Sequence, residues 1–232
     1  SGSAPGVFSD RRGSRWRGAH FVGCANFTML PILQRLAHSG LIWRGRVDGG
    51  QRLTLSTGYP ELDAILPGGG WPCGALVEVC LPCDGIGEIQ LFLPSMVALS
   101  ACSRWLLWAQ TPYIPYAPAL VNAGINLEYL WILRLRRGDP NLPWAVEKAL
   151  RTEACGMVLA WPQRLTATTV RRLQLAAETG GSIGVFFHSR QDAKLPAAVR
   201  LELQPSSRGL QVQVCKARGA SQGGTVYLKL AP

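Results

Sequence analysis

The segment "ALVEVCLPCDGIGEIQ", residues 75–90, decides the fold class of this chain. Its first six residues form a short, mostly apolar run, which predicts a buried strand. A turn containing Gly85 and Gly87 follows, and a helix is expected to start near Gly87. Pro94 would lie inside this helix, so the helix either begins later or bends there. Many proteins hold a nucleotide phosphate in a turn of this kind, between a strand and the N-terminus of a helix.

This turn lacks the side chains that phosphate chemistry needs. In a phosphate loop, backbone N–H groups cradle the phosphates, a lysine neutralises their charge, and a Ser or Thr holds Mg²⁺. The lysine and the hydroxyl are absent here, and the carboxylates of Asp84 and Glu88 would repel a phosphate. We interpret the segment as a degenerate phosphate loop formed by Cys83, Asp84, Gly85, Ile86, Gly87 and Glu88.

Strands and helices are expected to alternate after the loop. Apolar runs predict four strands, at residues 104–110, 129–135, 156–161 and 182–187. Amphipathic spacing between them predicts three helices, at residues 117–124, 142–155 and 166–181. Continuous apolar strands that alternate with helices indicate an α/β fold with a mainly parallel sheet flanked by helices. The last third alternates apolar and polar residues instead, which predicts antiparallel strands at one edge, at residues 199–203, 210–217 and 225–230.

The composition suits one sizeable domain. Hydrophobic residues make up 47% of the 232 and charged residues 16%. We expect a flexible leader over residues 1–28, an N-terminal helix and linker over 29–50, and the main domain over 51–232. The short helix is a candidate docking element, and its apolar positions at helical spacing are Leu30, Leu33 and Leu36.

The net charge of +10 is unevenly distributed, because residues 1–58 hold eight Arg against two Asp. This balance favours an acidic partner, such as nucleic acid, an anionic surface or an acidic protein. Of seven Cys, Cys80 and Cys83 form one CxxC, but no second CxxC and no paired His lies at zinc-ligand spacing. We therefore expect reduced, buried thiols, no metal and no cofactor.

No apolar run in the sequence approaches the roughly 20 residues that a membrane helix needs. The arginines near the N-terminus are not followed by the apolar core of a signal peptide. The expectation is a soluble cytoplasmic protein.

A longer stretch around the loop resembles the opening of the RecA recombinase core. The segment "LSTGYPELDAILPGGGWPCGALVEVCLPCDGIGEIQ", residues 55–90, contains the Ser-Thr-Gly, Leu-Asp, glycine-rich and Val-Glu elements in the RecA order. With "PYAPAL", "AGI" and "RRLQLAAE", the pattern is similar to the ImuA family, RecA-like accessory proteins of damage-induced translesion synthesis. It is also similar, less closely, to the SulA family of cell-division inhibitors.

The resemblance implies that the ATPase chemistry has been lost. Gln110 falls where RecA has its water-activating Glu, and an amide cannot act as a general base. Trp161 falls where RecA has its Mg²⁺-supporting Asp, and an indole cannot serve a metal ion. Together with Glu88 in place of the lysine, these lost catalytic positions predict a RecA-like fold without catalysis, and no enzyme.

The leading functional expectation is a non-catalytic accessory protein of SOS-induced translesion synthesis and mutagenesis. By its resemblance to ImuA, it would bind an inactive Y-family polymerase-like partner (ImuB-like), RecA, and an error-prone replicative polymerase. The first alternative is a SulA-like inhibitor that binds the division GTPase FtsZ. Two further alternatives are a DNA-binding module and a working nucleotide-dependent enzyme.

Several exposed residues are candidate contacts with a protein partner or with DNA. The Pro-rich segment 112–118 is expected at the carboxyl edge of the sheet, where ligands of open α/β sheets usually bind. We also expect the densest basic groups on the surface. The candidates are Tyr113, Tyr116, Arg134, Arg136, Arg137, Arg171 and Arg172. For the tryptophans, the strand positions 105, 108, 131 and 161 are expected in the core, Trp144 on the inward face of its helix, and Trp71 near an edge.

Overall fold

A computed structural model describes residues 53–136, 138–189, 196–217 and 223–230. The expected leader and N-terminal helix, with Leu30, Leu33 and Leu36, lie outside these ranges, and so does Arg137. Everything below concerns the described part of the chain.

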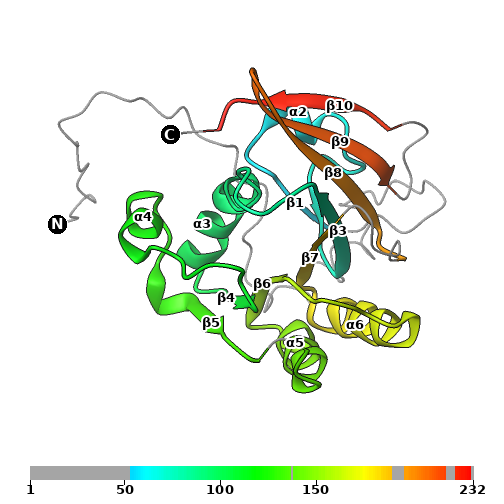
Figure 1. The fold of residues 1–232 in the computed structure, drawn as a ribbon. Coiled ribbons are helices and arrows are strands. Elements are labelled where there is room, and N and C mark those ends of the chain that lie inside the picture. The colour runs from blue at the N-terminus through cyan, green and yellow to red at the C-terminus, as the bar shows by residue number, and fades with distance from the viewer. Residues whose placement is uncertain (1–52, 137, 190–195, 218–222, 231–232) are drawn as a thin grey trace, which may run out of the picture. The chain divides into compact units, whose positions relative to one another are not determined.

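The domain is built on an eight-stranded mixed sheet with the strand order β10-β9-β8-β3-β7-β6-β4-β5 (Figure 1). Its strands are β3 (Ala75–Leu81), β4 (Trp105–Ala109), β5 (Leu130–Leu133), β6 (Cys155–Ala160), β7 (Ile183–Ser189), β8 (Val199–Ser206), β9 (Gly209–Ala217) and β10 (Thr225–Leu228). The six strands from β8 to β5 run parallel to one another, β9 runs antiparallel to β8, and β10 runs antiparallel to β9. The α/β architecture with a mainly parallel sheet is thus confirmed.

One expected strand is placed differently from the prediction. Residues 199–203 alternate apolar and polar side chains, yet β8 pairs in parallel with β3 and only its other edge meets β9 in antiparallel register. The alternation arises because one face of β8 packs on the core while the other is only half covered. A period of two therefore reports one-sided burial rather than strand direction.

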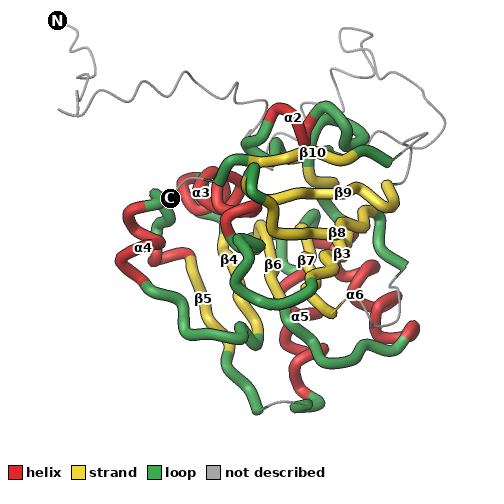
Figure 2. Tube along the Cα trace, turned by 45° about the horizontal axis from the view of Figure 1, so that its top comes forward, coloured by secondary structure: helices red, strands yellow, loops and turns green. Residues whose placement is uncertain are grey.

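Helices cover both faces of the sheet (Figure 2). One core contains α3 (Leu93–Ala101) and α4 (Ala117–Asn122); the other contains α5 (Asn141–Arg151) and α6 (Ala167–Gly180). Along β3 the side chains alternate, so that Val77 and Val79 enter the first core and Leu76 enters the second. A short hairpin of β1 (Thr54–Leu55) and β2 (Trp71–Pro72), with α2 (Pro60–Asp63) between its strands, precedes β3.

The boundaries of α6 follow from its sequence. The Thr166 hydroxyl accepts a hydrogen bond from the Thr169 N–H at the start of the helix, and Gly181 ends it with a left-handed φ of 64°. Val170 and Leu173 are buried, whereas Arg171 and Arg172 are exposed, as their helical spacing predicts.

The helix after the loop begins later than expected. A single 3₁₀ turn, η2 (Gln90–Phe92), comes first, and α3 starts at Leu93 with Pro94 in its first turn. Proline is tolerated there because the first N–H groups of a helix have no intrahelical acceptor. The helix N-terminus consequently lies several residues beyond the glycines of the loop.

Trp71 lies in the two-residue strand β2 and is completely buried, and its indole N–H donates to Ser95 Oγ at 3.0 Å. Two other tryptophan predictions are wrong. Trp131, expected in the core, is 64% exposed because β5 is the edge strand of the sheet. Trp144 is 58% exposed on α5, whose inward positions are taken by Leu142, Val146 and Leu150.

Candidate functional site

The loop over residues 82–89 links the carboxyl end of the central strand β3 to η2 and α3. Gly85 and Gly87 adopt φ values of +87° and +103°, which side chains with a Cβ rarely tolerate. A Cβ on Gly87 would also lie 2.3 Å from Leu230 Cδ1, because the chain beyond β10 passes over the loop. The two glycines thus fix the shape of the turn.

The carboxylate of Glu88 lies inside the loop. It is 3% exposed, and its two oxygens accept from the backbone N–H of Gly85 at 2.9 and 3.1 Å. Backbone N–H groups are what a phosphate loop offers to its anion. In this loop the N–H of Gly85 is satisfied by a carboxylate of the same chain.

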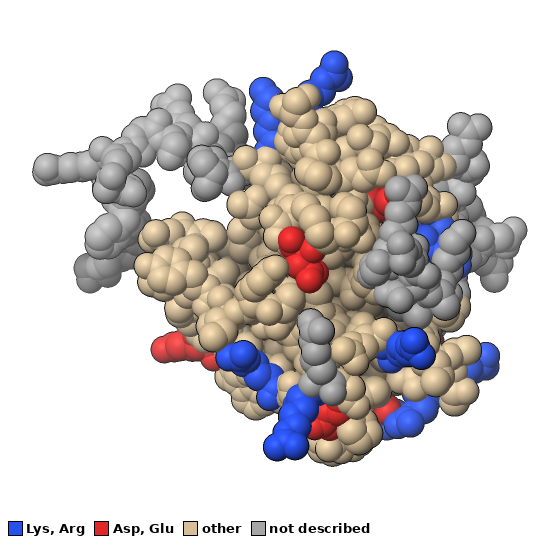
Figure 3. All heavy atoms as spheres, in the orientation of Figure 1, with Lys and Arg blue, Asp and Glu red and all other residues tan. Residues whose placement is uncertain are grey.

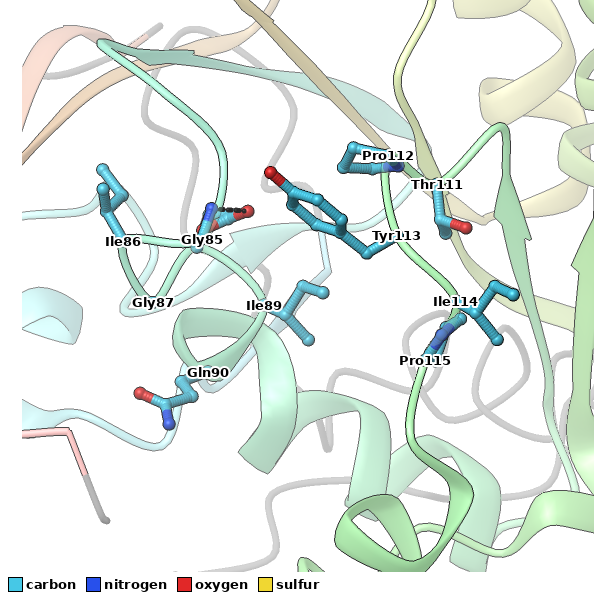
Figure 4. Close-up of a pocket in the computed structure, with 11 residues that line it drawn as sticks. Gly85, Ile86, Gly87, Ile89, Gln90, Thr111, Pro112, Tyr113, Ile114 and Pro115 are labelled. Carbon is cyan, nitrogen blue, oxygen red and sulfur yellow. Dashed lines mark hydrogen bonds between the residues drawn. The ribbon is translucent and has the colours of Figure 1, made fainter.

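A hollow of about 490 Å³ lies between this loop and residues 111–115, which follow β4 (Figure 4). The Tyr113 side chain points across it toward Gly85, while Ile114 points away from the loop. On the far side of the loop, the Tyr59 hydroxyl donates to the carbonyl of Gln90 at 3.1 Å, and burial raises the pKa of this tyrosine. The tyrosine thus anchors the turn that follows the loop.

The two positions that the RecA resemblance assigned to catalysis carry structural side chains. Gln110 directly follows β4 with a left-handed φ of 57°, and its amide donates to the carbonyls of Leu135 at 3.3 Å and Arg136 at 2.7 Å. It therefore joins the segments that follow two adjacent strands. The Trp161 ring stacks on Phe187 with centroids 4.4 Å apart.

Two buried polar atoms at this edge have no hydrogen-bond partner within the part of the chain that the structure describes. They are the hydroxyl oxygen of Thr111 and the indole nitrogen of Trp161, which follow the neighbouring strands β4 and β6. Thr111 also lines the hollow. An unmade hydrogen bond in a buried position costs about 1–3 kcal/mol, so water or a ligand group at this edge would be favoured.

The candidate contact residues do not form one continuous site. Tyr113 and Tyr116 are 69% and 72% exposed on the segment between β4 and α4, next to Ile114 at 72%. Arg134 and Arg136 are exposed after β5, and Arg172 forms an ion pair with Glu147 of α5. On the face shown in Figure 3, Lys and Arg lie in separate groups around the rim rather than in one patch. Their role in binding DNA or protein stays a prediction.

A polar cluster that the sequence did not predict lies on the second face of the sheet, the face that Leu76 shares. Glu78, Cys80 and His188 meet there on β3 and β7, with Arg200 of β8 beside them. The glutamate within an apolar strand was a usable signal, because a buried carboxylate needs a partner. Its partners could not be found by spacing, since His188 is 110 residues away.

Fold and site together define an α/β domain in which the loop after the central strand binds a carboxylate of the same loop, that of Glu88. In the described residues no helix is long and apolar enough to cross a membrane. The family of cell division inhibitor SulA matches residues 74–184, from just before β3 into β7.

Individual relatives agree with this match. A cell division inhibitor SulA of Edwardsiella piscicida is 33% identical over 123 residues, which are 52% of this chain and 71% of the relative. The SulA proteins of Yersinia pestis and Yersinia pseudotuberculosis are 35% identical over 107 residues, 46% of this chain and 62% of theirs. The chain thus spans less than two thirds of the Yersinia relatives. It belongs to the SulA family.

This finding overturns the leading expectation from the sequence. The chain is not assigned to the ImuA family, and a role in translesion synthesis with a Y-family polymerase-like partner, RecA or an error-prone polymerase is wrong. The relatives are named for inhibition of cell division.

Two of the motifs behind the wrong assignment stabilise a turn of the backbone. Asp63 accepts from the Ser56 hydroxyl at 2.6 Å and from the Thr57 N–H at 2.9 Å, so the Ser-Thr-Gly and Leu-Asp elements close a turn. "LPGGGWP" lies before residue 74, outside the matched range. Such features recur wherever the same turns are needed, and they do not separate proteins of different function.

Proposed function

We propose that this protein inhibits bacterial cell division by binding the division GTPase FtsZ. The observation that carries the proposal is the match to the SulA family over residues 74–184, supported by relatives that are 33–35% identical. The matched range contains the carboxyl ends of β3, β4, β5 and β6 and the segments that follow them.

The proposed contact surface is the segment between β4 and α4 with the start of α4. Tyr113, Ile114 and Tyr116 are about 70% exposed, and Val121 on α4 is 55% exposed. Exposed aromatic side chains on a proline-stiffened segment lose little conformational entropy on binding, and tyrosine is enriched among residues that dominate interfaces. The exposed Arg134 and Arg136, beyond the neighbouring strand, add positive charge at the same edge.

We further propose that the domain is a RecA-like fold whose loop 82–89 is a former phosphate loop. This is supported by the position of the loop after a central strand, by the Glu88 carboxylate on the Gly85 N–H, and by Gln110 and Trp161 at the two positions discussed above. Labelled ATP with Mg²⁺ should not bind; micromolar affinity would contradict this reading of the loop.

The experiment for the main proposal is a sedimentation assay of FtsZ assembly with GTP, using the full chain. The wild-type protein should reduce the pelleted FtsZ at near-stoichiometric amounts. Tyr113→Ala combined with Tyr116→Ala should raise the half-inhibitory concentration at least about tenfold, which corresponds to about 1.4 kcal/mol. A matched control is Tyr227→Ala, which removes a 46% exposed tyrosine from β10 at the opposite edge of the sheet.

Each result has a separate meaning. If the wild-type protein leaves FtsZ assembly unchanged at severalfold excess, the proposed function is wrong. If it inhibits but the Tyr113 and Tyr116 variant inhibits equally well, the function stands and the proposed surface is wrong.

A further inference from the structure

The polar cluster on the second face of the sheet has the composition of a metal site. Glu78 and Cys80 are two residues apart on β3, so their side chains lie on the same face. His188 is the register partner of Cys80 on the neighbouring parallel strand β7. The sheet therefore brings a carboxylate, a thiol and an imidazole together from two strands.

The three ligand atoms are close to the arrangement that a tetrahedral ion requires. His188 Nε2 lies 2.8 Å from Glu78 Oε1 and 3.8 Å from Cys80 Sγ. All three atoms lie within 4.8 Å of one another. With Zn–N and Zn–O near 2.0 Å and Zn–S near 2.3 Å, tetrahedral ligand atoms are roughly 3.3–3.8 Å apart. Small side-chain adjustments are enough to accommodate an ion.

Burial makes the cluster different from a chance group of surface residues. Glu78 is completely buried, Cys80 is 9% exposed, and the His188 side chain is 7% exposed. These polar groups are already removed from water in the folded protein, so metal binding requires little further desolvation. The surrounding sheet also restricts their rotamers. A binding ion would meet ligands that are largely preorganised.

Neighbouring charges complete the site. Arg200 of β8 donates through Nε to Glu78 Oε2, which leaves Oε1 directed at His188. Partners of this kind orient metal-binding carboxylates. The register partner of Cys80 on β8 is Glu202, a further carboxylate on this face. Zn²⁺ with one thiolate and one carboxylate is neutral, and the charges of Arg200 and Glu202 cancel.

We propose that Glu78, Cys80 and His188 bind a zinc ion that ties β3 to β7, with water completing the coordination. A set of one sulfur, one imidazole and one carboxylate favours Zn²⁺ over Ca²⁺ or Mg²⁺, which prefer oxygen ligands alone. On binding, the Cys80 thiol releases its proton to solvent and His188 presents an unprotonated Nε2. This site is distinct from the proposed FtsZ contact surface.

The test uses the full chain, stripped of metal under reducing conditions and titrated with Co²⁺ and then Zn²⁺. One equivalent of Co²⁺ should give the absorption of a thiolate–cobalt bond, and Zn²⁺ should displace it. Cys80→Ser should abolish this absorption, and His188→Gln should weaken binding by more than the roughly 10–100-fold that loss of an outer partner costs. Cys102→Ser, at the end of α3 in the other layer, is the matched control and should bind like the wild type.

Stability provides a second measurement. Zn²⁺ should raise the thermal midpoint of the wild type and of Cys102→Ser, but not that of Cys80→Ser. The proposal is overturned if the wild type shows no thiolate–cobalt absorption, or if the absorption is unchanged in Cys80→Ser. The second outcome would place the metal on other thiols of the chain.

Discussion

Replacement of Glu88 tests whether its carboxylate holds the loop together. In Glu88→Ala, the N–H of Gly85 loses an acceptor whose two oxygens lie at 2.9 and 3.1 Å. A hydrogen bond to a charged group is worth about 1.5–3 kcal/mol, and Glu88 is only 3% exposed, so water replaces it poorly. We expect the free energy of unfolding to fall by about 1.5–3 kcal/mol.

The conservative variant separates the charge from the shape of the side chain. Glu88→Gln keeps the length and one acceptor oxygen but removes the charge, so it should cost about 0.5–1.5 kcal/mol. The matched control is Glu153→Ala, an exposed glutamate between α5 and β6, which should change stability by less than about 0.5 kcal/mol.

The assay is urea unfolding of the full chain at constant pH. The midpoints are compared only between variants whose free energy of unfolding falls with the same slope against urea concentration. The expected order of stability is wild type, Glu88→Gln and Glu88→Ala, with Glu153→Ala close to wild type. The reasoning fails if Glu88→Ala is as stable as Glu153→Ala, because the carboxylate would then not be an internal ligand of the loop.

Two further predictions concern other positions. Gly87→Ala should lower the free energy of unfolding by about 1–3 kcal/mol through backbone strain, and by more because the new Cβ displaces Leu230. This loss should exceed that of Gly85→Ala, whose Cβ would meet nothing within 4 Å. Equal urea midpoints for the two variants would contradict the contact with Leu230. Burial raises the pKa of the Cys155 thiol to about 12, so the folded state keeps it protonated while the unfolded chain ionises near its ordinary value of 9. Folding stability is unaffected below pH 9 and falls between pH 9 and 12, so the stability of the wild type relative to Cys155→Ala should drop by about 1.4 kcal/mol from pH 8 to 10. A constant difference would show that the thiol is not protected by burial.

The sequence by itself determined the fold class and most element positions. The short apolar run at residues 75–80, bounded by turn residues, predicts a buried strand. The Thr166 and Gly181 caps fix the ends of α6 through local hydrogen bonds and backbone geometry. The loop residues and the exposed positions of Arg171 and Arg172 were also readable, because each depends on neighbours within a few residues.

The tertiary structure decided what depends on pairing between distant strands. The position of β5 at the sheet edge exposes Trp131, and the pairing of β3 with β7 brings Cys80 to His188. β8 pairs in parallel with β3, although its alternating pattern had predicted an antiparallel strand. Strand order depends on which strands pack side by side in the folded chain, and the spacing of residues along one strand does not encode it. For the same reason local motifs pointed to the wrong family, since turn residues specify backbone shape and not the surface that binds a partner.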